Sequence, residues 1–208
     1  METPFASEGV RGTLHEPDAP SGDGIVLTHG AGSNSNAPLL VNLARAFADA
    51  GYFVLRYDLP FRQKRLKGPP FPAMAARDRE GVAEAVAAMR RLAHGHLIAG
   101  GHSYGGRQTA MAAAEHHGLA NALLLLSYPL HPPAKPAQKR TDYFPRVRTP
   151  ALFVHGTADP FGSLEELREA IALIPAHTDL VAVEGAAHDL KRAADLSSDL
   201  LERLRALV

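Results

Sequence analysis

The chain of 208 residues has no cysteine, which excludes disulfides, thiolate zinc sites and a cysteine nucleophile. It also has no excess of charge of either sign, because 22 basic side chains balance 22 acidic ones. A balanced chain gives no reason to expect nucleic acid or a membrane surface as a partner. No apolar run is long enough to span a bilayer, and residues 1–5 lack the basic and apolar regions of a signal peptide. We therefore expect a cytoplasmic protein.

The composition is that of a globular protein. About 46% of the residues are apolar and 21% are charged, as in ordinary soluble domains. A length of 208 residues suits one domain better than two, and no internal repeat or change in composition divides the chain. We predict a single domain over residues 1–208, which exists as a monomer or a homodimer.

From residue 24 to the end, short apolar segments alternate with longer segments of helical periodicity. The short segments lack a two-residue alternation, as strands do when both faces of a sheet are covered; they are residues 24–28, 52–57, 96–100, 122–126, 151–155 and 179–183. Helices are predicted at 37–50, 75–93 and 104–116, from a capping box at 163–166, and in a last segment with Leu190, Ala194, Leu200, Leu201 and Leu204. This alternation predicts an α/β fold, an open and mostly parallel doubly wound sheet with helices on both faces.

Two proline-rich segments, residues 59–73 and 128–150, interrupt the alternation. Each follows the predicted C-terminal end of a strand, which is the edge where open α/β sheets bind ligands. The two segments carry the basic residues Arg62, Lys64, Arg65, Lys67, Lys135, Lys139 and Arg140. We expect either an electropositive rim that favours acyl groups with a carboxylate or phosphate, or ordinary solvated loops.

The sequence Gly-Gly-His-Ser-Tyr-Gly-Gly at residues 100–106 joins a predicted strand to a predicted helix. A serine in Gly-x-Ser-x-Gly at such a junction is typical of a nucleophile elbow, whose tight turn leaves no room for side chains at the two flanking glycines. The alternative is a plain strand-to-helix turn that happens to contain a serine. On the first interpretation, Ser103 is the nucleophile.

A serine hydroxyl needs a base to take its proton. His188 follows the last predicted strand, so its loop reaches the same sheet edge as Ser103. Asp159 follows the strand at 151–155 and is the candidate acid that orients His188, since residues 127–129, after the preceding strand, offer no carboxylate. The order serine, aspartate, histidine is that of α/β hydrolases. The bland alternatives are a surface histidine and an aspartate in a turn before proline.

The stretch Thr-His-Gly-Ala-Gly-Ser at residues 28–33 follows the first central strand, and its small residues leave backbone N–H groups accessible. The N–H groups of Ala31 and Tyr104 are candidates for an oxyanion hole that holds a tetrahedral intermediate. Taken alone, this glycine-rich stretch would also suit a phosphate, although the chain has no Gly-Lys-Ser/Thr motif.

Further residues near this edge are candidate substrate contacts: His29, Arg62, Tyr128, His131 and Phe161. The aromatic residues among them would form the wall of an acyl pocket, or would be ordinary core packing. The histidines that end near the same edge show no metal-ligand spacing, so we predict no metal site.

The chain resembles the α/β-hydrolase superfamily from about residue 20 to residue 205, and in detail the small, nearly lidless members grouped near the dienelactone hydrolases. A closer resemblance, to a branch with testis-expressed and chromatin-complex-associated relatives, rests on residues 29–33, 101–106, 128–133 and 156–162. The resemblance implies a Ser-Asp-His hydrolase without a cofactor. Dienelactone hydrolases themselves use a cysteine nucleophile, whereas this chain has Ser103, so their substrate does not carry over.

Three functions fit these observations. The first is a serine esterase that cleaves a small soluble acyl ester through an acyl-enzyme. The second is a non-catalytic interaction module that kept the hydrolase fold, and the third is an acyltransferase that uses the same three residues.

Overall fold

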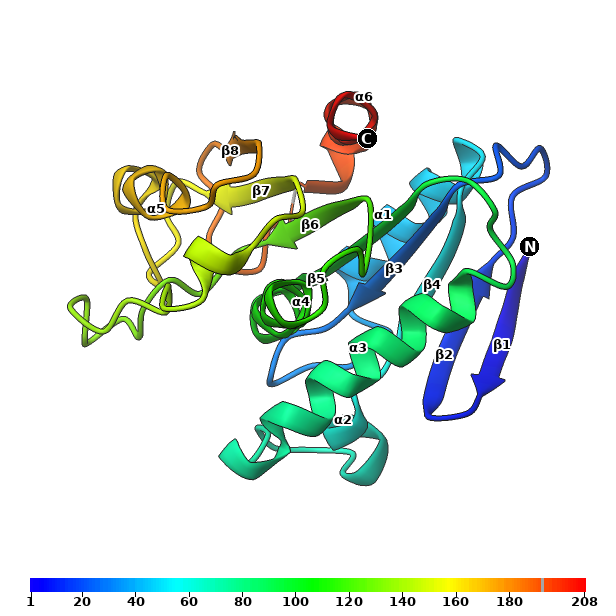
Figure 1. Cartoon of the computed structure of the whole chain (residues 1–208), viewed down its shortest axis with the longest axis horizontal. Coiled ribbons are helices and arrows are strands. Elements are labelled where there is room, and N and C mark those ends of the chain that lie inside the picture. The colour runs from blue at the N-terminus through cyan, green and yellow to red at the C-terminus, as the bar shows by residue number, and fades with distance from the viewer. Residues whose placement is uncertain (192) are drawn as a thin grey trace.

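An eight-stranded sheet lies at the centre of the computed structural model, which describes residues 1–191 and 193–208 (Figure 1). The strands are β1 (Glu2–Ser7), β2 (Val10–His15), β3 (Gly24–Thr28), β4 (Phe53–Tyr57), β5 (Leu97–His102), β6 (Ala122–Leu126), β7 (Ala151–Gly156) and β8 (Thr178–Val183). Their order in the sheet is β1-β2-β4-β3-β5-β6-β7-β8. Only the pairs β1–β2 and β2–β4 are antiparallel, so the sheet is open and mostly parallel, as predicted.

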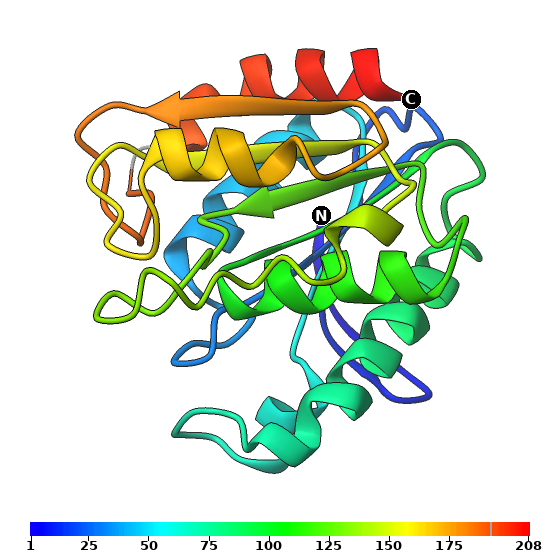
Figure 2. The same ribbon diagram turned by 60° about the vertical axis from the view of Figure 1, so that its left-hand side comes forward.

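Helices cover both faces of this sheet (Figures 1 and 2). The helices are α1 (Pro38–Asp49), α2 (Pro60–Lys64), α3 (Ala75–Met89), α4 (Tyr104–Glu115), α5 (Leu164–Ile171) and α6 (Ser197–Leu207), with short 3-10 turns η1 (Pro72–Met74), η2 (Phe144–Arg146) and η3 (Ala193–Leu196). The apolar sides of α1 and α6 pack into one hydrophobic core. Those of α3, α4 and α5 pack into a second core on the opposite face, which confirms the doubly wound arrangement.

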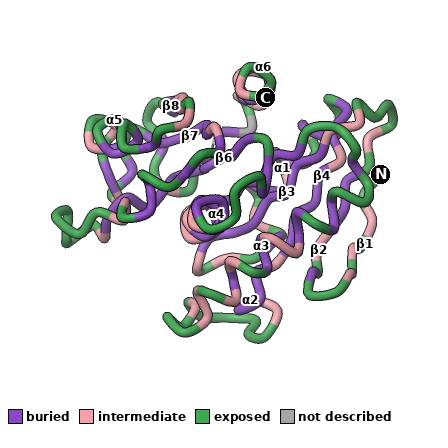
Figure 3. The backbone as a smooth tube through the Cα atoms, in the orientation of Figure 1, coloured by how far each residue is buried: buried purple, intermediate pink, exposed green. Residues whose placement is uncertain are grey.

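The six predicted strands are present, with ends that differ from the prediction by no more than two residues. Every residue of β3 and β6 is buried, and the central strands run as buried tubes through Figure 3. Burial on both faces explains why these strands are apolar throughout. The predicted capping box at Ser163 is also present. The Ser163 side chain accepts a hydrogen bond from the Glu166 N–H, and the Glu166 side chain accepts one from the Ser163 N–H.

The secondary structure differs from the prediction in several places. The short helix α2 lies in a proline-rich segment where no helix was predicted, and the helix predicted at 75–93 ends at Met89. The hairpin β1–β2 was not predicted; in β1 exposed and half-buried residues alternate, because this strand lies at the edge of the sheet. The last helix starts at Ser197, so the prediction that it includes Leu190 and Ala194 is wrong. Leu190 has a left-handed φ of 47°, which an α-helix does not accept, and Ala194 lies in the 3-10 turn η3. Over the described residues, no helix is both long and apolar enough to cross a membrane.

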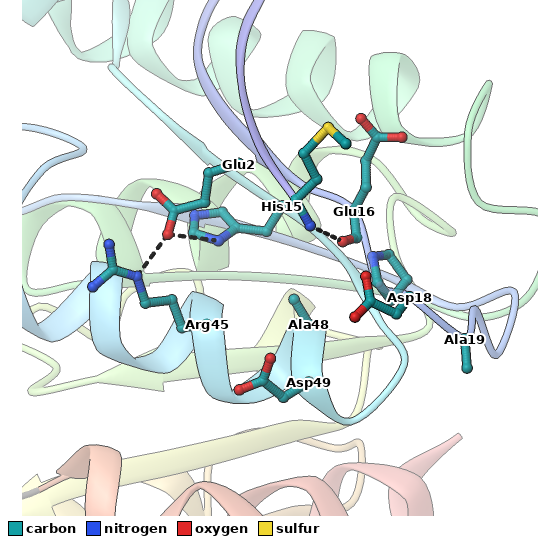
Figure 4. A pocket seen from close by; sticks show the side chains of 10 residues that line it. Glu2, His15, Glu16, Asp18, Ala19, Arg45, Ala48 and Asp49 are labelled. Atoms are coloured by element: carbon teal, nitrogen blue, oxygen red, sulfur yellow. Dashed lines mark hydrogen bonds and ion pairs between the residues drawn. The ribbon is translucent and has the colours of Figure 1, made fainter.

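A pocket beside the edge hairpin holds a buried histidine, His15, which is 2% exposed (Figure 4). Arg56 Nε donates a hydrogen bond to His15 Nε2 at 2.8 Å, so this ring nitrogen must be an acceptor and the ring must be neutral. Burial, with the nearby charge of Arg56, lowers the pKa of His15 from 6.5 to about 4.

This lowered pKa predicts a loss of stability as the pH falls from about 6.5 to about 4. In that window the unfolded chain binds a proton that the folded His15 refuses, which lowers the free energy of unfolding by at most about 3 kcal/mol. Urea unfolding of the wild type and of His15→Gln at pH 7 and pH 4.5 measures the effect. Glutamine still accepts from Arg56 but does not titrate, so we expect a flatter pH dependence. The exposed His94→Gln should keep the wild-type dependence, and an unchanged dependence in His15→Gln contradicts the prediction.

Candidate functional site

Ser103 is the single residue between β5 and α4. Its backbone conformation is strained, with φ of 52° and ψ of −116°. A Cβ atom at Gly101 would lie 2.8 Å from the carbonyl carbon of Gly105. A Cβ atom at Gly105 would lie 2.6 Å from the carbonyl oxygen of His29. The glycines are therefore required by the close approach of the strand, the helix and the loop after β3, as expected for a nucleophile elbow.

The structure brings Ser103, His188 and Asp159 together in one hydrogen-bonded row. Ser103 Oγ lies 2.8 Å from His188 Nε2, and His188 Nδ1 lies 2.8 Å from Asp159 Oδ2. The Asp159 side chain is fully buried and that of His188 is 23% exposed. Each of the three follows the C-terminal end of a parallel strand, so the sheet alone sets their common edge.

Asp159 is held as a carboxylate. Its burial would raise the pKa, but hydrogen bonds from the His188 ring and from the Phe161 N–H outweigh burial and lower the pKa of Asp159 below its usual value. The two oxygens have separate partners, since Oδ1 accepts from Phe161 N–H at 2.9 Å and Oδ2 faces His188. This arrangement fixes the ring with its proton on Nδ1 and leaves Nε2 as the acceptor for Ser103.

The predicted oxyanion donors lie on the two segments that flank Ser103. A Cβ atom at Gly30 would lie 3.4 Å from Ser103 Cβ, so the loop with Ala31 adjoins the serine. Tyr104 is the first residue of α4, and its N–H therefore has no acceptor within the helix. Backbone N–H groups at such a position favour negative charge.

His102 is a site residue that the sequence analysis considered only among the histidines near the sheet edge, as a possible metal ligand. Its Nε2–H donates to the carbonyl oxygen of His188 at 2.7 Å, and its Nδ1 would lie 3.1 Å from a Cβ atom at Gly30. Burial lowers the pKa of His102, which keeps the ring neutral. The side chain thus ties the strand end, the loop of His188 and the loop of Ala31 together, and its place directly before Ser103 was the available signal.

Comparison with known proteins places the chain in a family. The sequence matches the family described as the alpha/beta hydrolase domain over residues 22–207. The chain belongs to the α/β-hydrolase family. Family membership supports hydrolysis as the general class of reaction, and the closer kinship with testis-expressed and chromatin-complex-associated relatives stays a prediction.

Three solved structures share the fold over nearly their whole length. Est1E from Butyrivibrio proteoclasticus is 18% identical, with a TM-score of 0.75 over 99% of this chain and 98% of its own. XC6422 from Xanthomonas campestris, described as an α/β serine hydrolase without a lid, is 20% identical. Its TM-score is 0.77, and the match covers 100% of this chain and 95% of that protein. A dienelactone hydrolase from Anabaena variabilis is 24% identical. Its TM-score is 0.71, and the match covers 97% of this chain and 96% of that protein.

In this α/β hydrolase, Arg62 has a structural role instead of the substrate contact that we predicted. The side chain is 3% exposed, and its guanidinium donates to the carbonyl oxygens of Ala31, Ser33, Arg65 and Gly68. Four of the five N–H donors of Arg62 are therefore occupied by backbone carbonyl groups. The residue instead braces the loop of Ala31 against the segment after α2.

Three other residues predicted to contact substrate are buried, and their polar atoms lie against partners within the protein. His29 is fully buried, with Nδ1 on the carbonyl oxygen of Gly30 and Nε2 accepting from Leu59 N–H at 3.2 Å. Tyr128 is fully buried, and its hydroxyl bonds to Tyr143 Oη at 2.6 Å. His131 is 5% exposed, with Nδ1 on the carbonyl oxygen of Pro132 and Nε2 3.5 Å from Glu166. These side chains shape the loops around the site.

Phe161 is the predicted contact that the structure brings to the site. Its ring centroid lies 4.3 Å from that of His188, with 32° between the ring planes. The ring is half-buried, and its backbone N–H holds Asp159. Among residues 1–191 and 193–208, no group of three His, Cys, Asp or Glu side chains is placed to hold a metal ion.

Proposed function

We propose that this protein is a serine hydrolase that cleaves a small carboxylic ester through an acyl-enzyme, with Ser103 as nucleophile, His188 as general base and acid, and Asp159 as the group that orients His188. The row of two 2.8 Å hydrogen bonds, Ser103 to His188 and His188 to Asp159, is the observation that carries the proposal. The left-handed Ser103 supports it, since a plain turn has no need of this strain.

In the first half of the reaction, Ser103 Oγ attacks the ester carbonyl carbon while its proton passes to His188 Nε2. The negative charge that develops on the carbonyl oxygen is met by the N–H groups of Ala31 and Tyr104. The tetrahedral intermediate then collapses, the bond to the alkoxy oxygen breaks, and the alcohol leaves with the proton from His188. The acyl group remains on Ser103 as an ester.

In the second half, His188 takes a proton from water, whose oxygen attacks the acyl carbon. A second tetrahedral intermediate collapses, the bond to Ser103 Oγ breaks, and the proton returns from His188 to the serine. The carboxylic acid product leaves, and the enzyme is restored without any cofactor.

The dimensions of the surroundings favour a small substrate. A cavity of about 390 Å³ lies between the N-terminal part of α1 and the loop of His188, which is the size of a pocket for a small molecule. Its wall contains Leu39 and Leu40 together with His102, the neighbour of the proposed nucleophile. An apolar wall of this kind suits an uncharged acyl or alcohol group better than an ion.

Reaction with a fluorophosphonate, followed by intact-mass measurement, tests the proposal. We expect a single adduct on the wild type and none on Ser103→Ala. Ser127→Ala is the matched control, because Ser127 also has a left-handed φ, of 46°, at the end of the neighbouring strand, but its buried hydroxyl has no hydrogen-bond partner among the described residues. This control should label like the wild type.

Two other results would redirect the assignment. A folded wild type that forms no adduct contradicts an activated serine and favours the interaction module. Labelling at Ser103 together with faster turnover in the presence of added alcohols, and with new esters as products, favours acyl transfer over hydrolysis.

A further inference from the structure

Arg107 lies one turn into α4, and one nitrogen of its guanidinium is unpaired among the described residues. Its Nε is buried and has no hydrogen-bond acceptor among the described residues. Its environment differs from that of Arg79 on the adjacent α3, whose Nε donates to Glu115 at 2.8 Å. A buried N–H of a guanidinium normally has an acceptor, because leaving it unpaired costs free energy. Because Arg107 as a whole is only half-buried and lines a groove, its terminal N–H groups remain open to an anion from outside the chain.

Gln108, the next residue, also has a buried polar atom without a hydrogen-bond partner among the described residues. It is 1% exposed, and its Oε1 is buried without a donor among the described residues. A glutamine amide offers either its oxygen or its NH₂ group at one place, according to a rotation of 180°. Gln108 can thus donate to a carboxylate that Arg107 attracts, or accept from a hydroxyl beside it.

Both residues line one groove of about 310 Å³. Tyr104, Arg107, Gln108 and Met111 form the side of the groove on α4, and residues 70–72 with Ala75 form the other side. Positions 104, 107, 108 and 111 lie on one face of a helix, so the groove follows α4 from the residue next to Ser103. A mostly apolar groove with two polar groups is typical of a site for a small organic ligand.

The local charge also favours an anion. Burial lowers the pKa of the Arg140 guanidinium, and the positive charge of Arg107 lowers it further. Two guanidinium groups therefore lie within electrostatic reach of one another. Arg140 is directed at the carbonyl oxygen of Pro129 and not at a carboxylate. A negative group in the groove would relieve this repulsion.

We propose that this groove is a subsite for a carboxylate of the substrate, held by Arg107 and Gln108, and that the enzyme acts on short acyl esters whose acyl chain ends in a carboxylate. The inference rests on the proposed esterase function for the scissile bond, but its carboxylate contact can be tested separately. A carboxylate fits the two terminal N–H groups of an arginine side by side, which gives both affinity and orientation.

The helix geometry sets the length of the acyl chain. Arg107 lies four positions after Ser103, which corresponds to about 6 Å along the helix axis. Side chains of a helix tilt toward its N-terminus, so Arg107 reaches back toward Ser103. The carboxylate should therefore stand about three to five carbon atoms from the scissile carbonyl.

Kinetics with a matched pair of esters test the proposal. Mono-4-nitrophenyl glutarate carries the carboxylate, and 4-nitrophenyl pentanoate has the same chain length without the charge. For Arg107→Met, we expect the ratio of kcat/KM for the anionic ester to that for the neutral ester to fall about 10- to 100-fold, mostly through KM. Arg107→Lys keeps the charge and should recover part of the ratio. Higher salt should lower the ratio in the wild type.

Arg79→Met is the control, because it removes a nearby positive charge that is outside the groove. Its ratio should stay within about twofold of the wild-type ratio, as expected for a surface charge. A ratio unchanged in Arg107→Met, or lowered equally in Arg79→Met, overturns the carboxylate subsite.

A binding measurement separates this inference from the proposed function. If the wild type cleaves neither ester, the esterase assignment fails, and NMR titration of the wild type and of Arg107→Met with glutarate then decides about the groove. Shifts of the α4 amides in the wild type that are lost in Arg107→Met support the subsite. No binding of glutarate to the folded wild type overturns it.

Discussion

Asp159→Asn is expected to lower kcat by about 10³- to 10⁴-fold while leaving the fold intact. The Phe161 N–H donates to Oδ1 of residue 159 at 2.9 Å, so the amide oxygen of asparagine takes this position. The amide NH₂ must then face His188 Nδ1, which has to become an acceptor. The ring proton moves to Nε2, and His188 can no longer accept the proton of Ser103.

Steady-state kinetics and the thermal midpoint of Asp159→Asn measure this effect. Asp189→Asn is the matched control, since Asp189 lies beside His188 but its carboxylate is 53% exposed and pairs with Lys191 at 3.3 Å. We expect this control to change kcat less than about threefold. An Asp159→Asn enzyme that keeps a tenth or more of the wild-type kcat would show that the carboxylate does not set the tautomer of His188.

Gly105→Ala is expected to reduce both stability and activity, although alanine favours helices by up to about 1 kcal/mol over glycine. The added Cβ would lie 2.6 Å from the carbonyl oxygen of His29 and 2.8 Å from Thr28 Cγ2. Overpacking against backbone costs about 1–3 kcal/mol. The loop of Ala31 must move to relieve the contact, and a shift of about 1 Å at a reacting centre lowers kcat by about 100-fold.

Gly32→Ala is the control for this steric effect, because a Cβ atom at Gly32 meets no other atom within 4 Å. Urea unfolding and kcat of the two variants, measured side by side, give the comparison. We expect Gly32→Ala to match the wild type in both. A Gly105→Ala protein with wild-type stability and kcat would mean that the elbow and the loop after β3 are not in tight contact.

The sequence predicts the central sheet and the row of Ser103, His188 and Asp159 because both depend on local patterns. Buried parallel strands are apolar throughout, and their C-terminal ends share one edge, so residues placed just after them converge without further information. The hairpin β1–β2 escapes this reasoning. Its outer strand is exposed along one side and contains Pro4, which is tolerated at an edge but weakens the strand signal.

The prediction of Arg62 as a substrate contact disagrees with the structure for a different reason. Arg62 lies among exposed basic residues in a proline-rich segment, so the sequence suggests that it is exposed as well. In the structure it is buried, and its guanidinium donates to four carbonyl groups. Arg107 instead keeps a buried Nε without an acceptor among the described residues, and it lies in α4, outside the proline-rich segments. Which charges are compensated depends on contacts between segments distant in sequence, and composition within one segment does not contain that information.

The spacing of the site along the chain has a consequence for biosynthesis. His188 lies 85 residues after Ser103, and β8, which precedes His188, pairs at the far edge of the sheet with β7. At about 5–20 residues per second, a ribosome adds these 85 residues in roughly 4 to 17 s. During that interval the elbow can form while its serine has no base, so the nascent chain is not open to premature acylation. On the proposed mechanism, reactivity arises only when the C-terminal part of the sheet has docked, so labelling of Ser103 would report completed folding.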